Sequence, residues 1–352
     1  MNIVHPGKHV WDTLRFPVAA SILVAYYLLR GGLPPEREQT IGLLCFALLV
    51  ATASTDWRRS ASTILNWLPF LVLMVIYDYT RGAADDLGMP IQTQLPIVAD
   101  RLLCDCYVNT VIREWIPTNP KTNSPDAYWY EAVFSVTYAS HFLLPYVTSA
   151  VFWLKDKNRF YRFRDTFFLL TFAGLLIYIL LPTTPPWLAG DQGLIPDISR
   201  ETRTAGNGWR VLNVSWAEQL LDKGRAASNP VAALPSLHAG YSLFFTLMIW
   251  PRAKWTRPIL FLFPLVMAVT LMVASEHYFF DIWLGWVFAA GAVWAFSGGR
   301  YEQVRAKVRS WLVDWTGLEF NQVDDNIADE TVDSLMLDAD QEASDRHFET
   351  RN

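Results

Sequence analysis

Two histidines and one aspartate in this 352-residue chain have the types and spacing that chemistry requires. His277 and Asp281 are four residues apart in a stretch that opens an apolar segment. On a helix, this spacing stacks the two side chains on one face, where a carboxylate and an imidazole can pair. A second histidine, His238, opens an earlier apolar segment after a proline, a serine and a leucine. The fold must therefore bring His238 and His277 together if they act jointly.

The composition is typical of a protein with several membrane spans. Hydrophobic residues make up 52% of the chain, and most of them lie in runs with few charges. The net charge of −5 comes largely from an acidic C-terminal stretch, and nothing indicates a nucleic-acid partner. We expect an all-α fold, a membrane helix bundle of about eight transmembrane helices. The runs able to span are 16–29, 40–54, 62–79, 130–154, 166–181, 235–250, 258–274 and 277–296.

Lysine and arginine predict the orientation of these spans. In an eight-span count every strongly basic link falls on one side of the membrane, which predicts that this side and both termini are cytoplasmic. His238 and His277 then lie together at the extracytoplasmic face, and we expect an integral protein of the plasma membrane. The basic residues are Arg58, Arg59, Lys155, Lys157, Arg159, Arg162, Arg164, Arg252, Lys254, Arg257, Arg300, Arg305, Lys307 and Arg309.

Four segments are expected along the chain. Residues 1–61 hold two N-terminal spans, and residues 62–298 form the catalytic bundle, whose long link 80–129 carries an amphipathic helix. Residues 299–318 form a helix on the cytoplasmic membrane surface, or one packed on the bundle. Residues 319–352 form an acidic, disordered tail.

The three cysteines do not predict a disulfide framework. Cys45 lies in an apolar run. Cys104 and Cys106 flank one residue, so a bond between them would be strained, and two free thiols are expected. No metal and no cofactor is expected.

Three short blocks are predicted to meet at the extracytoplasmic face. The first, residues 180–187, ends in Pro-Pro-Trp, and its prolines stop a helix. In the second, 235–238, proline suits a first helical turn, whose free N–H groups favour phosphate. Ser236 can add a hydroxyl donor. The third block holds His277 and Asp281.

Two histidines with one carboxylate suit phosphoryl transfer through a phosphohistidine. One imidazole attacks phosphorus, Asp281 holds its tautomer, and the other imidazole protonates the leaving oxygen. The phosphoryl group also needs positive charge. The sequence does not choose among the basic candidates Arg81, Arg203, Arg210, Lys223 and Arg225.

These blocks resemble the type 2 phosphatidic acid phosphatase superfamily, and most closely its inositol phosphorylceramide synthase (aureobasidin-resistance) branch. That branch has Pro-Pro-Trp, Pro-Ser-Leu-His and His-Tyr-x-x-Asp blocks, which correspond here to 185–187, 235–238 and 277–281. The phosphatase branch has a glycine at the position of Leu237 and a Ser-Arg pair at the position of Thr270 and Leu271. The resemblance implies a six-helix catalytic core with His277 as nucleophile, Asp281 as its partner and His238 as general acid/base.

Each candidate also has a structural alternative. The pair of His277 and Asp281, or His238 alone, could be a hydrogen-bonded structural feature. His141, inside the fourth span, either binds substrate or joins two helices. Trp187 is a substrate platform or an interface anchor, and Arg81 could extend to the lipid head groups.

The predicted function is that of an integral-membrane phosphotransferase acting on phospholipid or another lipid phosphate. By resemblance the transferred head group is phosphoinositol. A lipid-phosphate phosphatase, in which water replaces the acceptor, and a non-catalytic lipid-binding membrane protein stay open as alternatives. A transporter is disfavoured because the candidate residues gather at one surface and not at the midplane. The sequence does not predict the oligomeric state.

Overall fold

The computed structural model describes residues 63–70, 89–119, 127–226, 230–249 and 254–316, with isolated positions between 14 and 76. The two predicted N-terminal spans lie largely outside these residues, and the acidic tail lies wholly outside them. Contacts divide the chain into two compact units, residues 1–69 with 302–352, and residues 70–301. The second unit holds all three blocks. The predicted four-segment division stays a prediction.

The second unit is built from helices, and its described residues form no strand beyond two isolated bridges at Thr183. The all-α prediction is therefore confirmed. The helices are α4 (Gln94–Cys104), α5 (Val108–Trp115), α6 (Trp129–Lys155), α7 (Lys157–Leu180), α8 (Pro186–Asp191), α9 (Gly208–Val211), α10 (Ser215–Ala226), α11 (Leu237–Met248), α12 (Arg257–Val273) and α13 (Phe279–Ala295), followed by α14 (Arg300–Thr316).

Long apolar helices with apolar outer surfaces mark the bundle as a membrane protein. Within the described residues, α7 and the segment Lys254–Val273 are long and apolar enough to cross a membrane, and α13 with the start of α14 is a third candidate, bent by 75°. The count of eight spans stays a prediction. Large apolar side chains point outward on four helices, where lipid tails would solvate them: Val136, Leu143, Val147, Leu154, Leu169, Phe172, Leu176, Ile259, Leu262, Leu265, Trp283, Val287 and Trp294.

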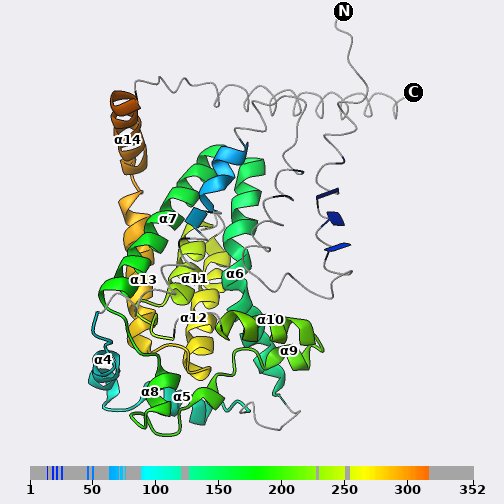
Figure 1. Cartoon of the computed structure of the whole chain (residues 1–352), viewed down its shortest axis with the longest axis vertical. Helices are drawn as coiled ribbons and strands as arrows, with labels where there is room; N and C mark the ends of the chain where they lie inside the picture. The colour runs from blue at the N-terminus through cyan, green and yellow to red at the C-terminus, as the bar shows by residue number, and fades with distance from the viewer. Residues whose placement is uncertain are drawn as a thin grey trace, which may run out of the picture. The chain divides into compact units, whose positions relative to one another are not determined.

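Helix α11 lies inside the bundle, in contact with α6, α7, α12 and α13 (Figure 1). Nine of its twelve residues are buried. At ~1.5 Å per residue it rises only about 18 Å, less than the ~30 Å of a hydrocarbon core. The run 235–250, predicted to span, therefore forms a short central helix. Gly174 of α7 leaves room for the Leu237 side chain. A Cβ atom on Gly174 would lie 2.7 Å from the Cδ2 atom of Leu237, closer than van der Waals contact allows.

The link 80–129 forms two helices where one was predicted. Asp105 takes a left-handed conformation, with φ of 48°, and ends α4. A short acidic residue tolerates this conformation better than most others. Helices α4, α5 and α8 lie at the end of the bundle where α13 begins (Figure 1). Cys106 is disulfide-bonded, so the prediction of free thiols is wrong for this residue.

Candidate active site

Backbone hydrogen bonds join the three blocks at one end of the bundle. The N–H of Thr183, in the first block, donates to the Val231 carbonyl at 2.6 Å. The N–H of Trp187 donates to the Ser275 carbonyl at 3.2 Å. These bonds tie the end of α7 and the start of α8 to the segments that lead into α11 and α13.

Two glycines let α11 and α13 cross in backbone contact. A Cβ on Gly285 would lie 2.2 Å from the Ser236 carbonyl oxygen, and one on Gly240 would lie 3.1 Å from the Gly285 carbonyl oxygen. The Ser236 N–H donates to the Asp281 carbonyl at 2.9 Å beside this crossing. The crossing places the His238 and His277 ring centroids 5.7 Å apart. The structure therefore brings together the two histidines that the sequence singled out.

His277 and Asp281 pair across the start of α13. Helix α13 begins at Phe279, so His277 precedes it and does not lie on its face as predicted. Asp281 Oδ2 lies 3.4 Å from His277 Nδ1 and accepts the Tyr278 N–H at 3.1 Å. Asp281 is fully buried and the His277 side chain is 8% exposed. Because the carboxylate faces Nδ1, the ring nitrogen left for chemistry is Nε2.

His238 lies in the first turn of α11, against two rings of α6. Ser236 caps this helix, and its Oγ accepts the Ala239 N–H at 3.3 Å. Pro235 precedes the cap, joined to Leu234 by a cis bond, and does not form the predicted first helical turn. The His238 ring stacks on His141 at 4.0 Å and on Tyr138 at 4.7 Å. His141 thus contacts His238, a position that fits either of its predicted roles.

Arg203 is a predicted cation that the structure places beside the segment leading into α13. Its guanidinium pairs with both oxygens of Glu276, the residue before His277, at 3.0 and 3.3 Å. It also lies over the Trp187 ring, 4.4 Å from the centroid. Trp187 is buried, so protein covers the side chain that was expected either to anchor at the lipid interface or to face substrate.

Among the other predicted cations, Arg210 has a described side chain, and it pairs elsewhere. Arg210 pairs with Glu218 at 2.7 Å, and this hydrogen bond raises the pKa of the Arg210 guanidinium. Lys223 and Arg225 lie on α10, and their side chains are outside the description. Arg81 lies outside the described residues.

A model of the PAP2 superfamily matches residues 117–295, about half of the chain, and these residues include all three blocks. The chain belongs to the PAP2 superfamily. This is the type 2 phosphatidic acid phosphatase superfamily that the blocks resemble, and the predicted resemblance is confirmed. The protein is accordingly an integral membrane protein of a superfamily of lipid phosphatases and phosphotransferases.

One relative of this PAP2 superfamily member carries a named activity. Phosphoinositol dihydroceramide synthase of Bacteroides thetaiotaomicron is 25% identical over 276 residues, which cover 75% of this chain and 85% of the relative. No solved structure matches the chain.

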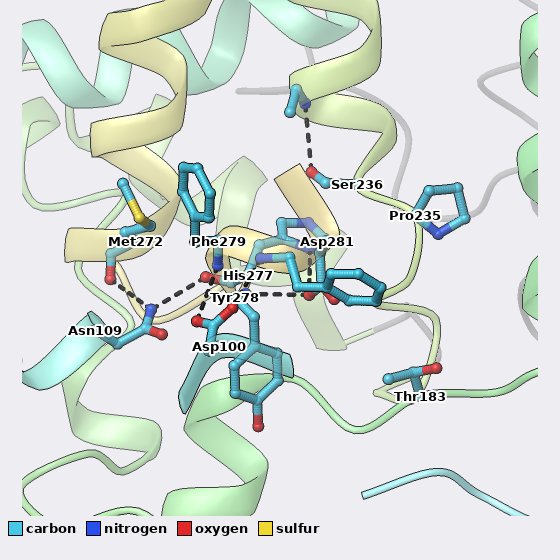
Figure 2. Close-up of polar contacts among 12 residues, drawn as sticks. Asp100, Asn109, Thr183, Pro235, Ser236, Met272, His277, Tyr278, Phe279 and Asp281 are labelled. Carbon is cyan, nitrogen blue, oxygen red and sulfur yellow. Dashed lines mark hydrogen bonds and ion pairs between the residues drawn. The ribbon is translucent and has the colours of Figure 1, made fainter. Parts of the chain in front are cut away.

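Two polar residues that the sequence reasoning missed contact the backbone around His277 from outside the PAP2 match. Asp100 of α4 accepts the N–H groups of Phe279 at 3.1 Å and Phe280 at 2.8 Å. Asn109 of α5 donates to the carbonyls of His277 and Met272, both at 3.0 Å (Figure 2). The available signal for Asp100 was its spacing of three residues from Ile97, an apolar residue that is buried in the structure.

Proposed function

We propose that this PAP2 superfamily member is a phosphotransferase that moves a phosphoinositol head group from a phospholipid to the hydroxyl of a ceramide-type lipid. The observation that carries the proposal is the arrangement of His238, His277 and Asp281. Two imidazoles lie 5.7 Å apart, and one has its Nδ1 atom facing a buried carboxylate. This geometry suits a nucleophile and a separate general acid on either side of one phosphoryl group.

In the first step of the proposed reaction, Nε2 of His277 attacks phosphorus. A nitrogen–phosphorus bond forms and the bond from phosphorus to the diacylglycerol oxygen breaks. His238, protonated, gives its proton to that leaving oxygen. Asp281 stabilises the imidazolium through Nδ1, as a buried carboxylate does beside other catalytic histidines.

In the second step the acceptor hydroxyl replaces diacylglycerol. His238, now neutral, takes the hydroxyl proton while the acceptor oxygen attacks phosphorus. The nitrogen–phosphorus bond breaks, which regenerates His277 and the protonated His238. A histidine pKa near ~6.5 lets the second imidazole serve as acid and then as base at neutral pH.

Three observations favour transfer over hydrolysis. Thr270 and Leu271 stand where phosphatases of the superfamily have a Ser-Arg pair, and the named relative is a phosphoinositol dihydroceramide synthase. His238 and His277 are each less than a tenth exposed, so bulk water has restricted access to the reacting atoms.

The proposed orientation has the site at the extracytoplasmic face of the plasma membrane, with both termini cytoplasmic. The positive-inside rule supports it. The disulfide bond of Cys106, in a link assigned to the outer side, fits an oxidising compartment.

The test uses purified full-length protein in lipid nanodiscs with phosphatidylinositol labelled in its inositol ring. The expected products are inositol phosphorylceramide, which carries the label, and unlabelled diacylglycerol. Both should form only when ceramide or dihydroceramide is added. His277→Ala, shown to be folded by thermal unfolding, should form neither product.

Other outcomes would replace the proposal. Release of inorganic phosphate from phosphatidic acid without any acceptor would assign a phosphatase. Labelled lipid that stays bound but unchanged, equally in the protein and in His277→Ala, would assign a non-catalytic lipid-binding protein.

A further inference from the structure

The first turn of α13 has its N–H groups satisfied by two carboxylates from different helices. A helix start leaves its first N–H groups without partners in the helix itself. Asp100 of α4 accepts two of them, from Phe279 and Phe280. Asp281 accepts the N–H of Tyr278, just before the helix. The same Asp281 oxygen, Oδ2, lies 3.4 Å from His277 Nδ1, so the contacts of Asp281 and Asp100 together surround the start of α13.

The chain before α13 is held by a second residue, Asn109 of α5. The segment from Met272 to His277 reverses direction through Ser275, whose φ is 55°. The reversal brings the Met272 and His277 carbonyl oxygens within reach of one donor. The buried Asn109 amide nitrogen donates to both at 3.0 Å. The backbone on both sides of the His277 side chain is therefore fixed (Figure 2).

We infer that Asp100 and Asn109 are positioning residues for the nucleophile His277, supplied by two helices that precede the PAP2 superfamily match. Neither residue touches the reacting atoms. They hold the backbone from which the imidazole projects, and they set the angle at which Nδ1 meets Asp281. The inference rests on the proposed function, since it assumes that His277 attacks phosphorus.

The alternative is that Asp100 only stabilises the fold. Burial raises the pKa of Asp100 from 3.8 to about 6, although the two N–H groups partly oppose this shift. The other ionisable groups facing it are Asp281 and Tyr278 on the α13 side, and Tyr107 across a small shared cavity. The ionised Asp100 carboxylate therefore lowers the stability of the folded protein at neutral pH. A role in stability alone does not account for a carboxylate at this position.

The experiment compares Asp100→Asn with Asp105→Asn in full-length protein. Asparagine keeps the shape of Asp100 but offers one acceptor oxygen in place of two and carries no charge. Asp105 is the matched control, because it lies just after α4, its side chain is 91% exposed, and it pairs only with Arg101 among the described residues. Its left-handed backbone also accepts asparagine.

For Asp100→Asn we expect kcat to fall about tenfold near pH 8, with KM within about twofold, because the nucleophile is misplaced and binding is not. The yield of trapped phosphohistidine in a single turnover should fall in parallel. Near pH 5 the native Asp100 is itself neutral, so the ratio of wild-type to variant kcat should fall towards one. Both proteins share the histidine titrations, which cancel in this ratio.

The inference is overturned if kcat per folded molecule is unchanged in Asp100→Asn, or if its loss is the same at every pH. If Asp100→Asn does not fold, the variant Asn109→Ser tests the inference instead. Its hydroxyl is too short to bridge both carbonyls, so kcat should fall with KM kept, and an unchanged kcat refutes the inference. A wild-type protein with no turnover, or an active His277→Ala, refutes the proposed function itself.

Discussion

Gly285 of α13 lies against the backbone of Ser236, the residue that caps α11. A Cβ on Gly285 would lie 2.2 Å from the Ser236 carbonyl oxygen, far inside van der Waals contact. The two helices that carry His238 and Asp281 can approach this closely only because the side chain is absent. The distance between the two histidines therefore depends on Gly285, the more tightly packed of the two glycines at the crossing.

Gly285→Ala should push α11 away from α13 and separate the imidazoles. We expect kcat to fall by about tenfold or more and the unfolding temperature to drop, since overpacking costs ~1–3 kcal/mol. Gly291→Ala is the matched control, because a Cβ at this site of the same helix has no atom within 4 Å. Equal activity in the two variants would show that the crossing does not set the histidine geometry.

Replacing the candidate nucleophile and its partner should have unequal effects. His277→Ala removes the attacking nitrogen, so neither turnover nor an acid-labile phosphoprotein should be detected. Asp281→Asn keeps the shape but loses the charge that stabilises the imidazolium, and kcat should fall about 10²-fold or more. Rapid-quench labelling measures both, with thermal unfolding as the check on folding. A phosphoprotein that persists in His277→Ala would move the nucleophile elsewhere.

Arg203 is predicted to bind the substrate phosphate in competition with Glu276. Arg203→Ala should raise the donor KM about tenfold, and Arg203→Lys should give an intermediate value because it cannot bind two oxygens in parallel. Glu276→Gln weakens the competing ion pair and should lower KM. Initial rates against donor concentration test all three variants.

The control for this series is Arg200→Ala. Arg200 lies in the same loop, its side chain is 71% exposed, and it pairs with Asp191 at 3.6 Å. Its KM should stay within about twofold of wild type, as expected for a surface pair. If the donor KM of Arg203→Ala also stays within about twofold of the wild-type value, Arg203 does not bind the substrate phosphate.

Asp100 should make the protein less stable as pH rises from about 4 to about 6. Its pKa is about 6 in the folded state against 3.8 as a reference for the unfolded chain, so the folded state holds the proton more tightly in this window. The contribution of Asp100 to the free energy of unfolding then falls as pH rises through this window, by at most about 3 kcal/mol. Above about pH 6 this contribution no longer changes. Asp100→Asn should lose this component of the slope, as measured by unfolding temperature against pH. A slope that is identical in the variant would contradict the assignment.

Local patterns in the sequence predicted most of the helices. The apolar runs 130–154, 258–274 and 277–296 match α6, α12 and α13 to within two residues at each end, because hydrophobic composition and length are properties of one segment. Helix α11 was predicted too long, since a buried central helix and a spanning helix have the same apolar composition. The break at Asp105 was missed because one left-handed residue leaves no periodic signal.

The sequence by itself determined that this is an all-α membrane protein, and it singled out His238, His277 and Asp281 as the candidates for phosphoryl transfer. Residue type and position at the start of an apolar run are local properties, so they can be read without coordinates. Only the tertiary structure showed that Arg203 pairs with Glu276, the residue before His277, and that Asp100 and Asn109 hydrogen-bond to the backbone around His277. These partners are 73 to about 180 residues away along the chain, and such contacts arise from how helices cross, which charge and spacing do not encode.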